Sequence, residues 1–125
     1  MKIGIIGATQ NKTKYGYKVL KNLIKKNIGE VYPINPNYKE IEGKKCYPSI
    51  YDIPYKLDLL VFILPPERGL KTLSSAVEKD IKNVWFQPGA ESKEIEEVCI
   101  ENKLNYSIGR CIMVISDEEV RDFIK

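Results

Sequence analysis

The first residues that could do chemistry form a short polar segment near the N-terminus. Residues 2–7 are a mainly apolar run that ends in Gly7, and a polar stretch leads from it into a segment of helical periodicity. The glycine allows a sharp turn, and the N-terminus of the following helix would offer unpaired N–H groups and its positive dipole end to a phosphate. A purely structural turn is the alternative, because the pattern G-x-G-x-x-G is absent. The candidate residues are Gly7, Ala8, Thr9, Gln10, Asn11 and Lys12, with Lys14 as a further source of charge.

A second polar segment, after the next predicted strand, bears on which nucleotide could bind. An NAD site normally has Asp or Glu at this point, because a carboxylate accepts hydrogen bonds from both ribose hydroxyls. Here the sequence is Ile34-Asn35-Pro36-Asn37-Tyr38-Lys39, without an acid. A lysine suits a phosphorylated ribose, so 3′-phospho-ADP, the nucleotide end of coenzyme A, fits better than NAD, and NADP also fits. Asn35, Pro36 and Lys39 are the candidates, and an ordinary turn with an exposed lysine is the alternative.

Two further loops follow predicted strands and complete the candidate site. Leu64, Pro65 and Pro66 lack donors for a phosphate but form a rigid apolar ledge that suits a flat adenine, although proline is also a common residue at a helix start. Gln87 and Pro88 precede another helix, and the amide there could face the pantetheine arm or the ligand of a partner.

Several kinds of catalytic chemistry are excluded by the residue types. The sequence contains no histidine, which removes Ser-His and Cys-His dyads, imidazole metal ligands and a phosphohistidine. The three cysteines, Cys46, Cys99 and Cys111, are widely spaced and odd in number, so neither a disulfide framework nor a Cys-x-x-Cys site is encoded. We expect reduced, partly buried thiols. Cys111 is interpreted as a packing residue, and a reactive thiol beside Arg110 is the alternative, because a nearby cation lowers the pKa of a cysteine.

These loops are placed by alternating strands and helices. Strands are predicted at residues 2–7, 30–35, 57–64 and 83–86 and near 106–108, with helices between them and a last short helix after Ser116. Gly29 is expected to end the first helix and Ser92 to cap the third, and Ser116 with Glu119 predicts a capping box at the start of the last. The predicted fold class is α/β: a Rossmann-type, doubly wound, five-stranded parallel sheet with helices on both faces. The expected strand order is 3-2-1-4-5. Ligands of such sheets bind at the carboxyl ends of the strands.

Length and composition are those of one ordinary globular domain. The 125 residues are 43% hydrophobic and 30% charged, so a single domain over residues 1–125 is expected. No apolar run approaches the roughly 20 residues that span a bilayer, and no signal peptide is visible, which favours a cytoplasmic protein without a membrane partner. The net charge of +3 comes from dispersed lysines, which suits a small anionic ligand at least as well as nucleic acid, and the denser basic stripe expected of a nucleic-acid-binding protein is absent.

A family resemblance rests on a combination of short segments along nearly the whole chain. They are Gly7-Ala8-Thr9, Pro33-Ile34-Asn35-Pro36, Ile41-Glu42-Gly43, Cys46-Tyr47-Pro48-Ser49, Leu64-Pro65-Pro66 and Trp85-Phe86-Gln87-Pro88-Gly89-Ala90-Glu91-Ser92. Together they resemble the small CoA-binding-domain family, whose members are similar to the N-terminal domain of the succinyl-CoA synthetase alpha subunit standing alone. The resemblance implies phosphate contacts after the first strand, ribose contacts after the second and further cofactor contacts in the other two loops. By position it implicates Thr9, Gln10, Asn11, Asn35, Pro36, Lys39, Leu64, Pro65, Gln87 and Pro88.

The sequence thus favours a module that binds coenzyme A or acyl-CoA and has no catalytic activity of its own. An NAD(P)-dependent oxidoreductase or a nucleotide-sensing domain of the same fold is a second interpretation. A third is a subunit that contributes a cofactor site to an acyl-CoA-metabolising complex. The expected partners are a nucleotide cofactor and a partner subunit or a second copy of the chain.

Overall fold

The computed structural model describes residues 1–125 and confirms the predicted fold class. Its main sheet has five parallel strands in the order β2-β1-β5-β6-β7. The strands are β1 (Lys2–Ile6), β2 (Glu30–Ile34), β5 (Leu59–Phe62), β6 (Asn83–Phe86) and β7 (Asn105–Ile108). None of the helices is both long enough and apolar enough to cross a membrane.

The predicted strand order was wrong in the placement of β5. In chain order the five strands lie 2-1-3-4-5, not 3-2-1-4-5, because β5 pairs with β1 and leaves β2 at an edge. All four residues of β5 are buried, and the middle of the sheet is where both faces of a strand are covered. Pro33 suits an edge strand, because a proline has no N–H to donate to a neighbouring strand of the sheet. Its carbonyl accepts a bond from the Tyr47 N–H (3.0 Å), which lies outside the main sheet.

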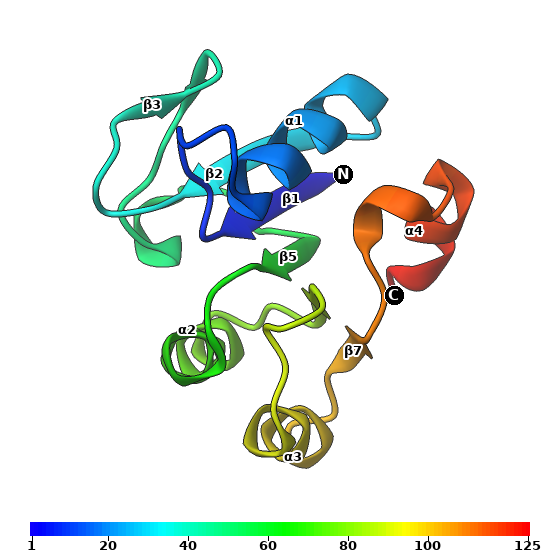
Figure 1. The fold of residues 1–125 in the computed structure, drawn as a ribbon. Helices are drawn as coiled ribbons and strands as arrows, with labels where there is room; N and C mark the ends of the chain where they lie inside the picture. The colour runs from blue at the N-terminus through cyan, green and yellow to red at the C-terminus, as the bar shows by residue number, and fades with distance from the viewer.

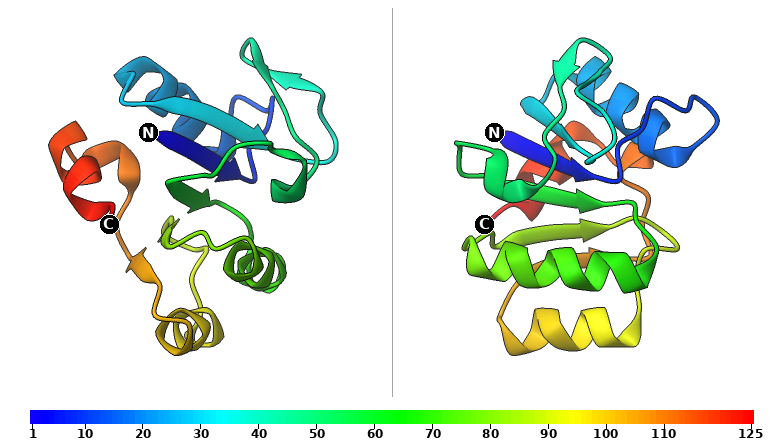
Figure 2. Two further views of the ribbon diagram at one scale, coloured as in Figure 1. Left: turned by 180° about the vertical axis from the view of Figure 1, so that it is seen from behind. Right: turned by 90° about the vertical axis from the view of Figure 1, so that its left-hand side faces the viewer.

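Helices cover both faces of the sheet, as predicted. Helices α1 (Tyr15–Lys26) and α4 (Asp117–Phe123) pack on one face, and α2 (Pro66–Glu78) and α3 (Lys93–Glu101) pack on the other (Figure 1). Alternation along β1 shows this division, because Ile5 packs in the core under α1 whereas Ile6 packs in the core under α2 and α3. The strand arrows in the right-hand view of Figure 2 point to one side, from which the loops into α1 and α2 leave.

Helix ends follow the local sequence, with two corrections. The C-terminal cap of α1 is Asn27, in the left-handed conformation at φ 54°, and not Gly29, which was expected to stop this helix. Ser92 caps α3 by accepting a bond from the Ile95 N–H, as predicted. Ser116 caps α4 through the Glu119 N–H, but the Glu119 carboxylate pairs with Arg110 (2.9 Å) instead of closing the predicted capping box.

A two-stranded hairpin stands beside the start of α1. It consists of β3 (Glu40–Ile41) and β4 (Lys44–Lys45) and lies between the second and third predicted strands, where no strand was expected. Glu42 joins it to α1, because its carboxylate accepts bonds from the Tyr17 hydroxyl (2.7 Å) and from the Lys21 ammonium group (2.9 Å). Two short 3-10 helices, η1 (Ile50–Asp52) and η2 (Ile112–Val114), complete the chain.

Candidate functional site

A cleft with a volume of about 940 Å³ lies at the carboxyl ends of β1 and β5. From β1 the chain continues to β2 on one side, and from β5 it continues to β6 on the other. The cleft is therefore at the topological switch point of the sheet, where the loops on the two sides diverge and leave a crevice. Its wall is formed by the loops after β1, β2, β5 and β6 together with Cys111.

The loop after β1 is ordered by its own side chains. The Thr9 hydroxyl accepts a bond from the Asn11 N–H (3.2 Å) and shares a second bond with the Tyr38 hydroxyl (3.0 Å). The Asn11 carboxamide oxygen accepts bonds from the N–H (3.1 Å) and the hydroxyl (2.7 Å) of Thr13. Thr9 and Thr13 line the cleft. Asn11 thus acts as a brace of the loop.

Helix α1 begins in the cleft wall without a side-chain cap. Lys14 occupies the N-cap position and makes no capping bond, and the first turn contains no acidic residue. The first N–H groups of a helix have no partner within it. Lys14, Tyr15 and Gly16 all line the cleft, so the positive end of the α1 dipole faces it.

Two glycines bring α1 close to the end of β1. Gly7 has φ +96°, a conformation that side chains rarely adopt. A Cβ on Gly16 would overlap the carbonyl oxygen of Gly7. The absence of both side chains therefore positions the N-terminus of α1 directly over the carboxyl end of β1.

The loop after β2 contributes Asn35, Asn37 and Tyr38 to the cleft. The Asn35 amide donates to the carbonyl of Ala8 (2.8 Å), and its oxygen accepts from the Asn37 N–H (2.8 Å). Asn35 thereby ties this loop to the loop after β1. No carboxylate is present at the point where an NAD site would have one.

The loops after β5 and β6 form the opposite wall. Ile63, Leu64, Pro65 and Pro66 provide an apolar surface. Gln87 is 3% exposed, and its amide is engaged internally: it donates to Cys111 Sγ (3.2 Å) and accepts from the Ile112 N–H (2.8 Å). Gln87 therefore holds residues 111 and 112 against the cleft.

The charge of the cleft wall is positive. Lys14 and Arg68 are its two charged side chains, and no carboxylate lines it. Both are exposed, and neither takes part in an ion pair. The wall is thus suited to an anion.

The predicted site residues divide into two groups by position. Those that line the cleft are Gly7, Thr9, Asn35, Leu64, Pro65, Gln87 and Pro88. Those outside its lining are Ala8, Gln10, Asn11, Lys12, Pro36 and Lys39. Ala8 is fully buried, and Gln10 donates its amide to the carbonyl of Glu40 on the hairpin (2.8 Å). Lys39 is exposed.

Sequence reasoning missed other residues of the wall. Thr13, Tyr15 and Gly16 lie just before or at the start of α1, Tyr38 precedes Lys39, and Arg68 lies in the first turn of α2. Thr13, Tyr15 and Gly16 could have been predicted from the sequence, because they lie at the N-terminus of a predicted helix, where anions bind. Cys111, expected as a packing residue, lines the cleft from a segment distant in sequence.

The thiols of the three cysteines are free. Burial raises the pKa of Cys46 above its usual value and raises the pKa of Cys99 to about 11. These two thiols stay protonated at neutral pH.

Comparison with known proteins identifies one family and several relatives. A family model described as a CoA binding domain matches residues 1–117. The alpha subunit of ADP-forming acetate–CoA ligase II from Pyrococcus furiosus is 34% identical over 112 aligned residues, and the match covers 85% of this chain and 24% of that protein. ADP-forming acetate–CoA ligase from Methanocaldococcus jannaschii is 38% identical over 102 residues, 82% of this chain and 14% of the relative. The chain thus spans about a quarter or less of the length of these relatives.

Solved structures show the same fold. A conserved hypothetical protein from Pyrococcus furiosus is 50% identical, with a TM-score of 0.86 over 90% of this chain and 97% of the other. Dinucleotide-forming acetyl-coenzyme A synthetase 1 from Ca. Korarchaeum cryptofilum, solved in complex with phosphate and ADP, is 28% identical, with a TM-score of 0.72 over 84% of this chain and 25% of the other.

Proposed function

This chain belongs to the CoA-binding domain family, whose ligand is coenzyme A, and we propose that it binds this cofactor in the cleft at the ends of β1 and β5. The observation that carries the proposal is the start of α1: an uncapped helix N-terminus lies in the wall of a cleft whose two charged side chains are both cations. Coenzyme A is an anion with a long, partly apolar arm, and the wall offers both positive charge and apolar surface.

The diphosphate of the cofactor belongs at the start of α1. The main-chain N–H groups of Tyr15 and Gly16 have no partner within the helix, and Lys14 adds a cation at the same place. The loop that leads there is already ordered by the Thr9 and Asn11 hydrogen bonds, so binding costs little additional conformational entropy.

The composition of the wall favours coenzyme A over NAD. An NAD site uses a carboxylate on the ribose hydroxyls, and the cleft has none. NADP has a phosphate on its adenine ribose where NAD has a hydroxyl group. It is therefore the strongest alternative to coenzyme A and is included in the test below.

The cleft contains groups that can bind a ligand, and it has no imidazole to act as a general base, since the sequence has no histidine. We therefore propose a binding module without a reaction of its own. The names of the ligase relatives, one of them an alpha subunit, favour a second candidate: a chain that contributes a coenzyme A site to an acyl-CoA-metabolising assembly.

Calorimetric titration with coenzyme A, acetyl-CoA, NAD and NADP tests the proposed ligand. Coenzyme A or its acetyl ester should bind more tightly than either dinucleotide. Tighter binding of NAD or NADP would instead favour an NAD(P)-dependent oxidoreductase or a nucleotide-sensing domain.

The substitution Tyr15→Glu tests the proposed place. Tyr15 is 63% exposed, and an acidic residue in the first helical turn favours the helix, so the variant should fold. The new negative charge should repel the diphosphate and weaken coenzyme A binding by about tenfold, as expected for a change on the order of 1.4 kcal/mol. The control is Lys25→Gln, which changes the net charge equally at the other end of α1 and should bind like the wild type. Equal affinities of both variants would place the diphosphate elsewhere.

A further inference from the structure

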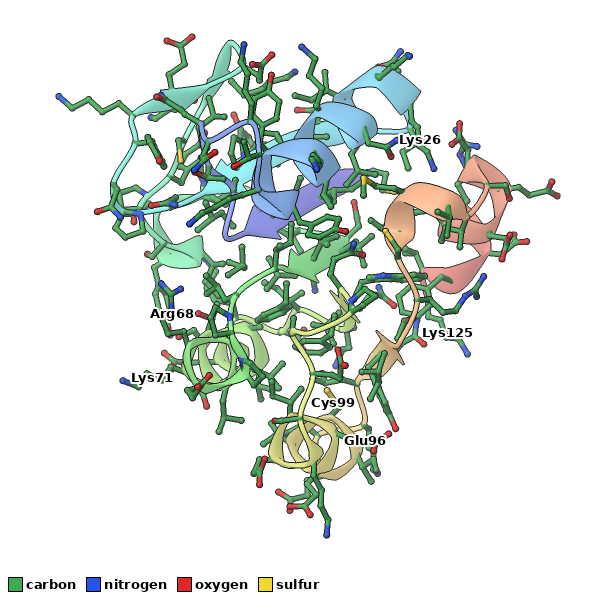
Figure 3. The ribbon with its side chains drawn as sticks, in the orientation of Figure 1. Lys26, Arg68, Lys71, Glu96, Cys99 and Lys125 are labelled. Atoms are coloured by element: carbon green, nitrogen blue, oxygen red, sulfur yellow. The ribbon has the colours of Figure 1, made fainter.

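Arg68 lines the cleft at a place other than the start of α1, where the diphosphate is proposed to bind. It lies in the first turn of α2, whereas α1 packs on the opposite face of the sheet. Its side chain is exposed, lines the cleft and has no carboxylate partner. Figure 3 shows Arg68 at the start of α2, while Lys71 points outward from the same helix.

Coenzyme A has more phosphate groups than the start of α1 can serve. Lys14 and the uncapped N–H groups are adjacent in the chain and suit the two linked phosphates of the diphosphate. The remaining phosphate is the monoester on the ribose, and a phosphate monoester carries about −1.5 to −2 charges near neutral pH. The second cation of the cleft is available for this group.

The side chain of Arg68 also has suitable chemistry. A guanidinium group is planar and donates two parallel N–H bonds to a phosphate, whereas an ammonium group acts as a point charge. Lys39, the residue that the sequence favoured for this contact, does not line the cleft. Its main-chain carbonyl accepts a bond from the Cys46 N–H (2.9 Å) at the base of the hairpin.

We propose that Arg68 binds the 3′-phosphate of coenzyme A and is the residue that distinguishes this cofactor from its dephosphorylated form. The inference rests on the proposed function of the cleft. Arg68 then acts as a specificity determinant on the α2 side, and α1 with Lys14 supplies the diphosphate contacts that both forms of the cofactor share.

The test compares calorimetric affinities for coenzyme A and dephospho-coenzyme A in the wild type and in Arg68→Gln. The wild type should prefer coenzyme A. Arg68→Gln should lose about tenfold or more in affinity for coenzyme A and change by less than about twofold for dephospho-coenzyme A, as expected for the loss of one charge-assisted contact. Arg68→Lys should keep part of the preference. Lys71→Gln is the matched control, because it removes one positive charge three residues further along α2, and it should retain the full preference.

The outcomes separate the inference from the proposed function. Failure of the wild type to bind either form would overturn the proposed function itself. A wild type that binds both forms equally, or an Arg68→Gln variant that keeps the full preference, would overturn the inference alone. Equal weakening of both ligands by Arg68→Gln would assign Arg68 to the diphosphate and would also overturn it. The same holds if Lys39→Gln abolishes the preference while Arg68→Gln does not.

Discussion

At the scale of single residues, two helical glycines occupy opposite kinds of environment. A Cβ on Gly16 would overlap the carbonyl oxygen of Gly7, so the close approach of α1 to β1 requires a glycine there. A Cβ on Gly69 would lie 3.7 Å from Phe62 and 3.8 Å from Ile95, an ordinary packing distance. The main chain at the end of β1 leaves no room for a methyl group at position 16, whereas position 69 can hold one.

We therefore expect alanine substitutions at these two glycines to have opposite signs. Gly16→Ala should lower the free energy of unfolding by about 1–3 kcal/mol, as overpacking does, and should weaken coenzyme A binding because the start of α1 must move. Gly69→Ala should raise the free energy of unfolding by about 0.5–1 kcal/mol, because alanine restricts the unfolded chain and favours a helix. Urea unfolding measures both changes. A destabilised Gly69→Ala, or an unaltered Gly16→Ala, would contradict the packing described for α1 and α2.

The residue scale also shows how far a sequence can locate a site. The turn at Gly7 and the apolar residues Leu64 and Pro65 were predicted from their places after strands, and they line the cleft. Arg68 was not predicted, because its access to the cleft depends on where α2 begins relative to β5. Gln10 was predicted as a ligand contact but donates to the hairpin, a partner that sequence spacing does not reveal.

At the scale of elements, one carboxylate makes the polar attachment of the hairpin of β3 and β4 to α1, and Ile41 adds an apolar one, because it is buried in the same core cluster as Val19 and Leu20. The Glu42 carboxylate accepts bonds from Lys21 and Tyr17. Hydrogen bonding by Lys21, followed by that of Tyr17, lowers the pKa of Glu42 below its usual 4.5. Such a carboxylate stabilises the folded state at any pH above the pKa that it has in the unfolded chain. This stabilisation is lost as the pH falls through its lower pKa in the folded state.

Acidification should therefore loosen the hairpin. We expect hydrogen exchange at the Cys46 N–H, which donates to the Lys39 carbonyl, to gain an additional contribution from local opening as the pH falls below about 4.5. Glu42→Gln should remove this pH-dependent component and leave the hairpin less protected at neutral pH. Glu40→Gln is the control, because the Glu40 side chain forms no ion pair and should behave like the wild type. An identical pH dependence in Glu42→Gln would remove this carboxylate from the attachment.

Element types were predictable from the sequence, and their lateral order was not. Apolar runs and helical periodicity revealed the five strands and the helices because each pattern is local. The pairing of β5 with β1 depends on contacts between residues far apart in sequence, such as Leu59 with Ile3. The hairpin escaped prediction because its strands have two residues each, too few to show a period.

At the scale of the whole molecule, the sheet order places the proposed site. Because β1 and β5 are neighbours, the starts of α1 and α2 meet the same crevice from opposite faces of the sheet (Figure 2). The order 3-2-1-4-5 would have placed β1 between β2 and β6 and the switch point between β1 and β6. A smaller cavity of about 370 Å³, lined by Tyr51 and Tyr55 among others, lies apart from this crevice.

A crystal structure of the chain with bound coenzyme A would show whether the start of α1 holds the diphosphate. We expect the diphosphate within hydrogen-bonding distance of the main-chain N–H groups of Tyr15 and Gly16, with the rest of the cofactor in the cleft between the loops after β1 and β5. Coenzyme A bound in the smaller cavity beside Tyr51 and Tyr55, or with its diphosphate away from the start of α1, would contradict this expectation.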